Sequence, residues 1–318
     1  MSKLKLGVIF GGMSTEHDVS ITSGTSVIKN LDKEKYEIYP IYINKEGIWY
    51  EYTKDVKNIE VLEVGTEIEE KIKIQNPLEY IDELDVVFPV LHGKYGEDGT
   101  IQGLLELVNK PYVGCKVLSS SICMDKVYAK VIFDKAKINQ AKYVYIKNVG
   151  NGYVYVDKEF NEKESSLEEM ADLVEKELAY PVFVKPSNSG SSVGIKKAHN
   201  KDEFIEAVKY AKLYDSKILV EEEIKGREVE CAVLGNSKVE ATCVGEILPA
   251  EEFYTFDAKY KNAESKVVIP AEISKEVAEE IRKNAIKAFK AVDGSGLSRV
   301  DFFIENGTNR VIVNEINT

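Results

Sequence analysis

The chain of 318 residues has 44% hydrophobic and 30% charged side chains, which is typical of a soluble globular protein with two or three lobes. Its net charge of −12 disfavours non-specific nucleic-acid binding, because that binding depends on a surplus of lysine and arginine. No apolar run approaches the roughly 20 residues that a membrane-spanning helix needs. We therefore expect neither a nucleic acid nor a membrane as a partner.

The chain start and the cysteines indicate a protein of a reducing compartment. Met1 is followed almost at once by a strand-like run at residues 4–10, without a signal-peptide cleavage site, so we expect a mature N-terminus. The cysteines form no CxxC pair and have no histidine cluster beside them (Cys115, Cys123, Cys231 and Cys243). We expect buried thiols in the cytoplasm and no structural zinc.

The first third of the chain alternates strand-like and helix-like segments. A strand at residues 6–10 ends in Gly11-Gly12, and a strand at 85–91 leads into His92-Gly93; between them we expect a helix at 20–31 and a strand at 37–43. This alternation predicts a parallel sheet, and ligands gather at the carboxyl ends of its strands. Both glycine-containing loops are therefore candidate walls of a site.

The remaining segments predict two further lobes. Ser166 and Glu169 match a capping box, and Val277, Ile281 and Ala285 recur at helical spacing in a later helix. We place boundaries near Cys123 and within residues 196–200, which predicts lobes at residues 1–122, 123–198 and 199–318. The other predicted elements are a helix from Asn200 and strands at 181–186, 217–223, 228–234, 238–248, 297–304 and 310–316.

A loop of small residues at 187–194 follows a strand that ends in Lys185-Pro186. Small residues let backbone N–H groups approach a polyphosphate, and Lys185 adds a point charge. Such loops are more often plain connectors, and the adjacent lysine is what favours a phosphate site. Three glutamates at 221–223, with Glu228 after a turn, could similarly be a solvated edge or could accept hydrogen bonds from a nucleoside.

The C-terminal strands carry the strongest constellation. Arg299 and Asp301 share one face of a strand, and Glu315 and Asn317 share a face of the next. If the strands pair as a hairpin, carboxylate and amide oxygens suited to Mg²⁺ converge beside a guanidinium that can neutralise developing negative charge. A surface hairpin with an ordinary salt bridge is the alternative.

Together these blocks resemble the D-alanine–D-alanine ligases of the ATP-grasp superfamily. The matching stretches occur in family order from Gly11 to Thr318: residues 11–20, 92–99, 185–194, 253–260, 298–303 and 314–317. The resemblance implies an α/β ATP-grasp fold, in which a Rossmann-like N-terminal lobe with a parallel sheet is joined to two α+β lobes that clamp ATP. It also implies a cytoplasmic homodimer that acts in peptidoglycan synthesis.

The resemblance further implies a role for each matching residue. Lys126, Lys185, Ser192 and Lys259 would contact the phosphates of ATP, and Glu221, Glu223 and Glu228 would surround the nucleoside. Asp301, Glu315 and Asn317 would bind two Mg²⁺ ions, for which Mn²⁺ can substitute. Glu16 would hold the ammonium of the first D-alanine in a cluster with Ser191 and Tyr260, while His92 lines the same pocket and Arg299 stabilises the tetrahedral intermediate.

The implied reaction joins two D-alanines through an acyl phosphate. A loop at 253–265 would close over that intermediate and exclude water. Relatives continue beyond the Asn-Glu-Ile-Asn-Thr block into a segment that contacts the carboxylate of the second D-alanine, whereas this sequence stops at Thr318. We therefore keep two alternatives: a D-alanine–D-serine ligase, and a nucleotide-binding relative that is inactive without that segment. A D-lactate-using relative is disfavoured by the intact Lys259-Tyr260 pair.

Overall fold

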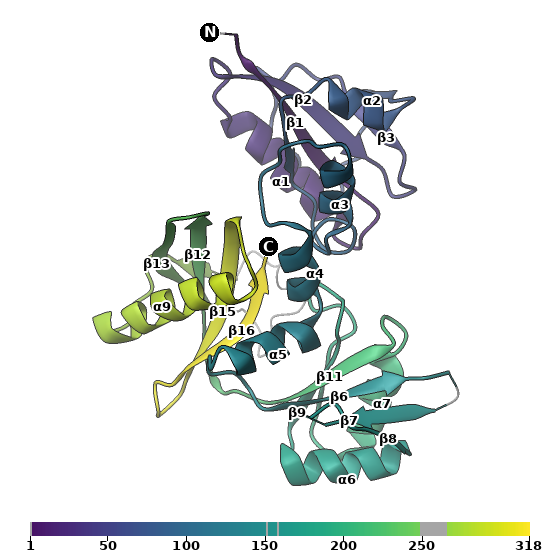
Figure 1. The fold of residues 1–318 in the computed structure, drawn as a ribbon, viewed down its shortest axis with the longest axis vertical. Helices are drawn as coiled ribbons and strands as arrows, with labels where there is room; N and C mark the ends of the chain where they lie inside the picture. The colour runs from purple at the N-terminus through teal and green to yellow at the C-terminus, as the bar shows by residue number, and fades with distance from the viewer. Residues whose placement is uncertain (1, 151, 158, 249–265) are drawn as a thin grey trace. The chain divides into compact units, whose positions relative to one another are not determined.

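The computed structural model describes residues 2–150, 152–157, 159–248 and 266–318. The chain forms two compact units. The first contains Met1–Ser121 with Gly294–Leu297 and Thr318, and the second contains Ile122–Asp293 with Ser298–Asn317. One sheet lies in the first unit, and two lie in the second (Figure 1).

The N-terminal unit is built on a mixed sheet in the order β4-β3-β2-β1-β5. β1 (Leu4–Gly11) pairs in parallel with β2 (Tyr36–Ile43) and β5 (Val86–Pro89), which confirms the predicted parallel core. Two strands that the sequence analysis missed, β3 (Trp49–Tyr52) and β4 (Lys71–Lys73), extend the sheet in antiparallel fashion. The helices of this region are α1 (His17–Asn30), α2 (Pro77–Asp82), α3 (Thr100–Leu107) and α4 (Val117–Met124).

Alternate residues of β1 enter different apolar clusters. Val8 and Phe10 pack with Ile21 of α1, whereas Ile9 packs with Ile101 of α3. A strand that is buried on both faces reads as a continuous apolar run, which is why this strand could be recognised from the sequence.

The central sheet has the order β10-β9-β11-β6-β7-β8. Its central strand β11 (Lys217–Glu222) pairs antiparallel with β9 (Val182–Pro186) and β6 (Tyr143–Asn148). The predicted lobe boundary at residues 198/199 is therefore wrong, because it would separate β11 from both hydrogen-bonded neighbours. The other elements are α5 (Lys126–Lys135), β7 (Tyr153–Val156), β8 (Glu162–Ser165), α6 (Leu167–Glu177), β10 (Lys196–Ala198) and α7 (Lys201–Ala211).

The C-terminal sheet has the order β14-β13-β12-β15-β16, and α9 (Lys275–Ala291) packs along it (Figure 1). The predicted terminal hairpin is confirmed: β15 (Gly296–Glu305) pairs antiparallel with β16 (Val311–Asn317). The remaining strands are β12 (Gly226–Gly235), β13 (Val239–Leu248) and β14 (Lys266–Val268).

The helix starts that we predicted in the second unit are formed by side-chain caps. Ser166 and Glu169 make a complete capping box at α6, and the Asn200 side chain caps α7. These contacts satisfy backbone N–H groups that have no partner within the first turn of a helix. Within the described ranges, none of the helices combines the length and apolarity needed to cross a membrane.

The cysteine prediction holds for three of the four thiols. Cys115, Cys123 and Cys231 are buried, whereas Cys243 is exposed. Cys243 lies on β13, where neighbouring positions face different sides of the sheet, so its exposure depends on strand pairing that the sequence analysis did not predict.

Candidate active site

The second unit contains a cavity of about 730 Å³, which is within the usual range for a small-molecule site. Side chains from α5, β9, β11, β12 and β16 and from the loop after β9 line it. Predicted site residues in the lining are Lys126, Lys185, Ser191, Ser192, Glu221, Glu223, Glu228 and Glu315. The fold thus brings together residues from three predicted nucleotide-binding segments and one predicted metal ligand, Glu315.

The loop at 187–194 forms one wall of this cavity. Ser191 and Ser192 have left-handed backbone conformations, with φ angles of 47° and 61°. Gly194 has a φ of 80°, and a Cβ atom there would lie 2.6 Å from Cγ of Pro186. Because left-handed backbone is uncommon in residues other than glycine, this loop is held by its surroundings.

Asp125 fastens the loop to the start of α5. Its carboxylate accepts hydrogen bonds from the Tyr128 backbone N–H at 3.2 Å, from Ser187 Oγ at 2.6 Å and from Lys217 Nζ at 2.5 Å. Burial alone would raise the pKa of Asp125, but the Lys217 and Ser187 hydrogen bonds outweigh it and hold this pKa below its usual value. The adjacent Lys126 Nζ donates to the Ser189 carbonyl at 2.6 Å and therefore lies against the same loop.

Glu221 lies at the centre of a buried charge cluster. Its Oε2 is 2.6 Å from Lys185 Nζ, and its Oε1 is 2.6 Å from Lys130 Nζ. Burial by itself would raise the pKa of Glu221, but the charges of Lys130 and Lys185 outweigh burial and lower it to about 2. Glu221 is thus ionised near neutral pH, and both of its oxygens already face ammonium groups.

Other charged residues close the cavity near the turn into β12. Glu223 Oε1 is 2.8 Å from Lys197 Nζ. Arg227 binds Glu246 through two hydrogen bonds, of 2.6 and 2.5 Å, and both residues line the cavity. Arg227 and Glu246 were not predicted as site residues, because nothing in the sequence shows that β12 and β13 pair beside the glutamates.

The hairpin at the C-terminal end positions the predicted metal ligands as expected from strand periodicity. Asp301 is the cross-strand partner of Glu315, and Arg299 is the partner of Asn317. Arg299 binds both oxygens of Asp301, at 2.8 and 2.9 Å, and the Asn317 amide donates to Asp301 at 2.9 Å. The Asp301 charge raises the pKa of Arg299 above its usual value.

The donor set of this hairpin suits a hard divalent cation. Two carboxylates and an amide are oxygen ligands that Mg²⁺ accepts when substrate phosphate and water complete its shell. Among the described residues, no group of three or more His, Cys, Asp or Glu side chains is arranged to hold a metal ion. Asp301 and Glu315 provide two such side chains and Asn317 an amide, so phosphate would have to complete the site. Glu315 Oε2 also lies 3.6 Å from Lys126 Nζ, which connects the hairpin to the cavity.

Glu230 was missed as a neighbour of Arg299. Its Oε2 lies 3.2 Å from Arg299 Nε, and burial raises the pKa of Glu230 even though the Arg299 charge opposes this shift. The signal was present in the sequence, because Glu228 and Glu230 share a face of one strand.

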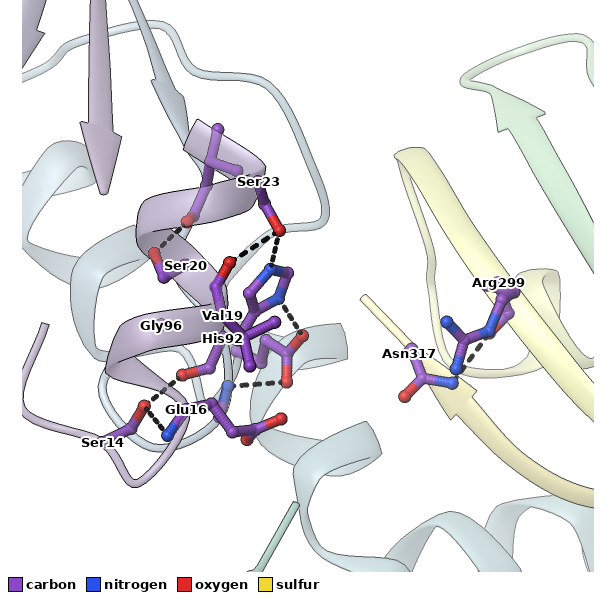
Figure 2. Close-up of polar contacts among 12 residues, drawn as sticks. Ser14, Glu16, Val19, Ser20, Ser23, His92, Gly96, Arg299 and Asn317 are labelled. Carbon is purple, nitrogen blue, oxygen red and sulfur yellow. Dashed lines mark hydrogen bonds and ion pairs between the residues drawn. The ribbon is translucent and has the colours of Figure 1, made fainter. Parts of the chain in front are cut away.

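A second cluster lies within the N-terminal unit, where Glu16 and His92 come together. Ser14 connects them: its hydroxyl donates to the His92 carbonyl at 2.6 Å and accepts from the Glu16 backbone N–H at 3.1 Å (Figure 2). Glu16 is buried, and its Oε2 would lie only 2.2 Å from a Cβ atom on Gly93. The two predicted glycine loops thus meet at the carboxyl ends of β1 and β5.

The His92 ring is oriented by two residues that we did not predict. Its Nε2 lies 2.9 Å from Ser23 Oγ (Figure 2). Its Nδ1 lies 3.7 Å from Glu97 Oε1. Glu97 belongs to the sequence block that begins at His92, so its proximity could have been suggested, whereas the Ser23 contact depends on how α1 packs.

Comparison with known proteins places this geometry in a family. The family model "D-ala D-ala ligase N-terminus" matches residues 5–115, and "D-ala D-ala ligase C-terminus" matches residues 133–318. The chain belongs to the D-alanine–D-alanine ligase family.

Several relatives of this ligase family match almost the whole chain. A D-alanine–D-alanine ligase of Clostridium acetobutylicum is 49% identical over 316 residues, covering 99% of this chain and 89% of the relative. D-alanine–D-alanine ligase B of Clostridium tetani is 49% identical over 320 residues, covering 100% and 85%.

Solved structures of the family have the same fold. The VanG D-Ala:D-Ser ligase from Enterococcus faecalis has a TM-score of 0.83 at 36% identity, covering 100% of this chain and 90% of that one. The D-alanine–D-alanine ligase from Coxiella burnetii has a TM-score of 0.78 at 32% identity, covering 100% and 85%. The predicted ATP-grasp fold is therefore confirmed.

Two residues predicted for the ligase reaction belong to a part of the chain that the structure does not describe. Lys259 and Tyr260, with the expected closing loop at 253–265, lie outside the described residues. Glu16 and His92 belong to the first unit, and the cavity and hairpin residues belong to the second. Their roles are therefore proposed for each unit separately.

Proposed function

We propose that this protein catalyses the ATP-dependent ligation of two D-alanines to D-alanyl-D-alanine for peptidoglycan precursors. Family membership and relatives named D-alanine–D-alanine ligase over nearly the whole chain support this reaction. The single structural observation that supports it best is the cavity, where Lys126 and Lys185 adjoin the Glu315 end of the carboxylate hairpin.

In the first step, a carboxylate oxygen of D-alanine attacks the γ-phosphorus of ATP, and ADP leaves. This produces an acyl phosphate, a better electrophile than the carboxylate. Lys126, Lys185 and the backbone of the loop containing Ser191 and Ser192 bind the phosphates, because ammonium groups and N–H donors stabilise charge on phosphoryl oxygens. Glu221, Glu223 and Glu228 contact the nucleoside, and Lys259 contacts the γ-phosphate.

Asp301, Glu315 and Asn317 would hold two Mg²⁺ ions in this proposal. Bound magnesium would neutralise charge on the phosphate oxygens and orient them. Arg299 and the Asn317 amide both contact the Asp301 carboxylate and so fix its position in the hairpin.

In the second step, the amine of the second D-alanine attacks the acyl carbon, loses a proton, and inorganic phosphate leaves. Arg299 stabilises the tetrahedral oxyanion, since it is a guanidinium held beside the phosphate-binding region. Within the N-terminal unit, Glu16 binds the ammonium group of the first D-alanine, and His92 lines that pocket.

An isotope experiment tests the reaction directly. D-Alanine labelled with ¹⁸O in its carboxylate is incubated with the protein, ATP and Mg²⁺, and dipeptide and phosphate are analysed by mass spectrometry. Because the attacking oxygen remains on phosphorus, one ¹⁸O should appear in each inorganic phosphate, in proportion to the dipeptide formed. L-Alanine is the control and should give neither product. Phosphate without label, or ATP hydrolysis without dipeptide, would contradict the proposal and favour an inactive or hydrolytic relative.

The alternative is a ligase that forms D-alanyl-D-serine. It is favoured by one observation, the TM-score of 0.83 to a D-Ala:D-Ser ligase. The protein would be incubated with ATP and equal concentrations of D-alanine and D-serine. The ratio of D-alanyl-D-alanine to D-alanyl-D-serine would decide between the two functions. A product that is mainly D-alanyl-D-serine would replace our first assignment.

Assembly and location rest on the family resemblance. We propose a homodimer, which light scattering coupled to size-exclusion chromatography would test. We also propose that the protein acts in the cytoplasm, where ATP is available.

A further inference from the structure

Lys130 is a buried lysine behind the wall of the cavity that no predicted role explains. Its side chain is 3% exposed, which is rare for lysine unless the charge is paired. It lies one helical turn after Lys126 on α5, so the two side chains share a face of that helix. Lys126 lines the cavity, whereas Lys130 is not part of its lining.

The ammonium of Lys130 contacts groups from two strands. Its Nζ is 2.6 Å from Glu221 Oε1 and 5.3 Å from the centre of the Tyr143 ring. Tyr143 and Glu221 are cross-strand partners on β6 and β11, so Lys130 packs over one continuous patch of the central sheet. The other carboxylate oxygen of Glu221, Oε2, lies 2.6 Å from Lys185 Nζ.

The charges of Lys130, Lys185 and Glu221 indicate what Lys130 does at this site. Two ammonium groups and one carboxylate leave a net charge of +1 (2 − 1) next to the cavity. With Glu221 and Lys185 alone, the buried pair would be neutral, and Glu221 would compete with phosphate for the Lys185 ammonium. Lys130 binds one carboxylate oxygen of Glu221, so Lys185 keeps N–H donors available for a ligand anion.

We propose that Lys130 is a positioning residue of the nucleotide site, which acts through Glu221 to direct Lys185 toward the phosphates. This inference deepens the proposed function and rests on it, because it takes the cavity to be the ATP site. Lys130 itself contacts neither nucleotide nor reacting atoms.

The test compares Lys130→Met with Lys135→Met, a matched control at an exposed position of the same helix. ADP binding in the presence of Mg²⁺ is measured by calorimetry, and KM for ATP and for D-alanine are measured in the ligase reaction. Lys130→Met should weaken ADP binding and raise KM for ATP by about tenfold or more, because a buried unit charge near the phosphates is lost. KM for D-alanine should stay within about threefold of wild type, and Lys135→Met should leave all three constants unchanged.

A purely structural role would give a different pattern. Lower thermal stability with unchanged ADP affinity and KM for ATP would overturn the proposal. If Lys130→Met does not fold, Lys130→Gln keeps a hydrogen-bond donor toward Glu221 and should show the same loss of ADP affinity. Failure of both variants to fold would assign Lys130 to the fold and also overturn the proposal.

The wild-type protein separates this failure from failure of the proposed function. Wild type that binds ADP and forms dipeptide, with unaffected Lys130 variants, removes only the positioning role. Wild type that binds ADP without forming dipeptide removes the ligase assignment, while the ADP measurements still decide on Lys130. If the wild-type protein does not bind ADP, both the proposed function and the positioning role of Lys130 are contradicted.

Discussion

Asp125 shows how one carboxylate can organise a site without touching a substrate. It caps α5 and also holds Ser187 and Lys217, so it joins the start of a helix, the start of the phosphate-side loop and β11. Replacing it with asparagine keeps the shape but removes the charge that Lys217 needs. The consequences are therefore electrostatic and depend on pH.

We predict that Asp125→Asn lowers the free energy of unfolding by about 2 kcal/mol at pH 7. The folded pKa of Asp125 lies below its unfolded value, so the stabilisation is fully present above the unfolded pKa and is lost as pH falls through the folded pKa. The difference between variant and wild type should therefore shrink from about pH 4 downward. Urea unfolding at several pH values measures this, and a constant difference down to the lowest pH would contradict it.

We predict that Glu315→Gln strongly reduces turnover and leaves the fold intact. Glu315 pairs across the hairpin with Asp301, and the loss of one charge should weaken binding of divalent metal with the nucleotide. The dependence of the rate on Mg²⁺ concentration is the measurement, with circular dichroism as the check on folding. Wild-type kcat at ordinary magnesium concentrations would show that the metal assignment is wrong.

We predict that Gly93→Ala raises KM for D-alanine by about tenfold and changes KM for ATP little. A Cβ atom at this position would approach Glu16 Oε2 to 2.2 Å, and the φ of Gly93 is 68°, so Glu16 and the backbone must both move. Gly103→Ala is a control in the same unit, because a Cβ there meets no atom within 4 Å. Equal effects on both substrates would argue against a D-alanine role for Glu16.

At the scale of elements, α5 contacts the phosphate-side loop and also positions two lysine side chains, Lys126 and Lys130. Its first residue, Lys126, contacts the phosphate-side loop and Glu315, and Lys130 reaches Glu221 one turn later. The helix period of 3.6 residues places both ammonium groups on one side. A small rotation of this helix would move both charges, which is a physical reason for the cap at Asp125.

The capping box at α6 allows a test of stability that is separate from catalysis. Ser166→Ala should cost about 1 kcal/mol, because the Glu169 backbone N–H loses its side-chain acceptor. Thermal unfolding should occur at lower temperature, with KM for ATP unchanged, since Ser166 is not in the cavity lining. An unchanged unfolding midpoint would mean that water replaces the cap without loss.

At the scale of the whole molecule, a chain with a negative net charge places several lysines at one site. The chain carries a net charge of −12, whereas Lys126, Lys130 and Lys185 gather at one cavity with Glu221 and Glu315. Because charge is screened over a Debye length of about 10 Å, the nearby lysines matter more to a bound phosphate than the distant surface does.

We predict that ADP with Mg²⁺ raises the unfolding temperature of the second unit. At one hundred times its Kd, ADP adds about 2.7 kcal/mol to the folded state, which corresponds to a shift of roughly 5–11 °C for a unit of this size. The same ADP with a metal chelator should give a smaller shift, because the hairpin carboxylates would face the phosphates without a bridging cation. Equal shifts with and without metal would argue against a joint site.

Much of the fold could be predicted from local patterns. The apolar run of β1, the caps at Ser166 and Asn200, and the alternation of Arg299 with Asp301 each follow from short-range geometry. Short elements such as β3 and β4 were missed, since strands of a few residues without a strong apolar pattern acquire their structure from the neighbours with which they pair.

The sequence by itself determined the residue types, their spacing along each element and, through these, the family and the candidate ligands. Only the tertiary structure decided which polar side chains meet: Lys130 with Glu221, Glu230 with Arg299, and Ser23 with His92. It also showed that the lobe boundary predicted at residues 198/199 is wrong, because β11 lies between β6 and β9 and is hydrogen-bonded to both. The physical reason is that periodicity specifies which face a side chain occupies, whereas its partner depends on strand order and helix packing between segments far apart in the chain.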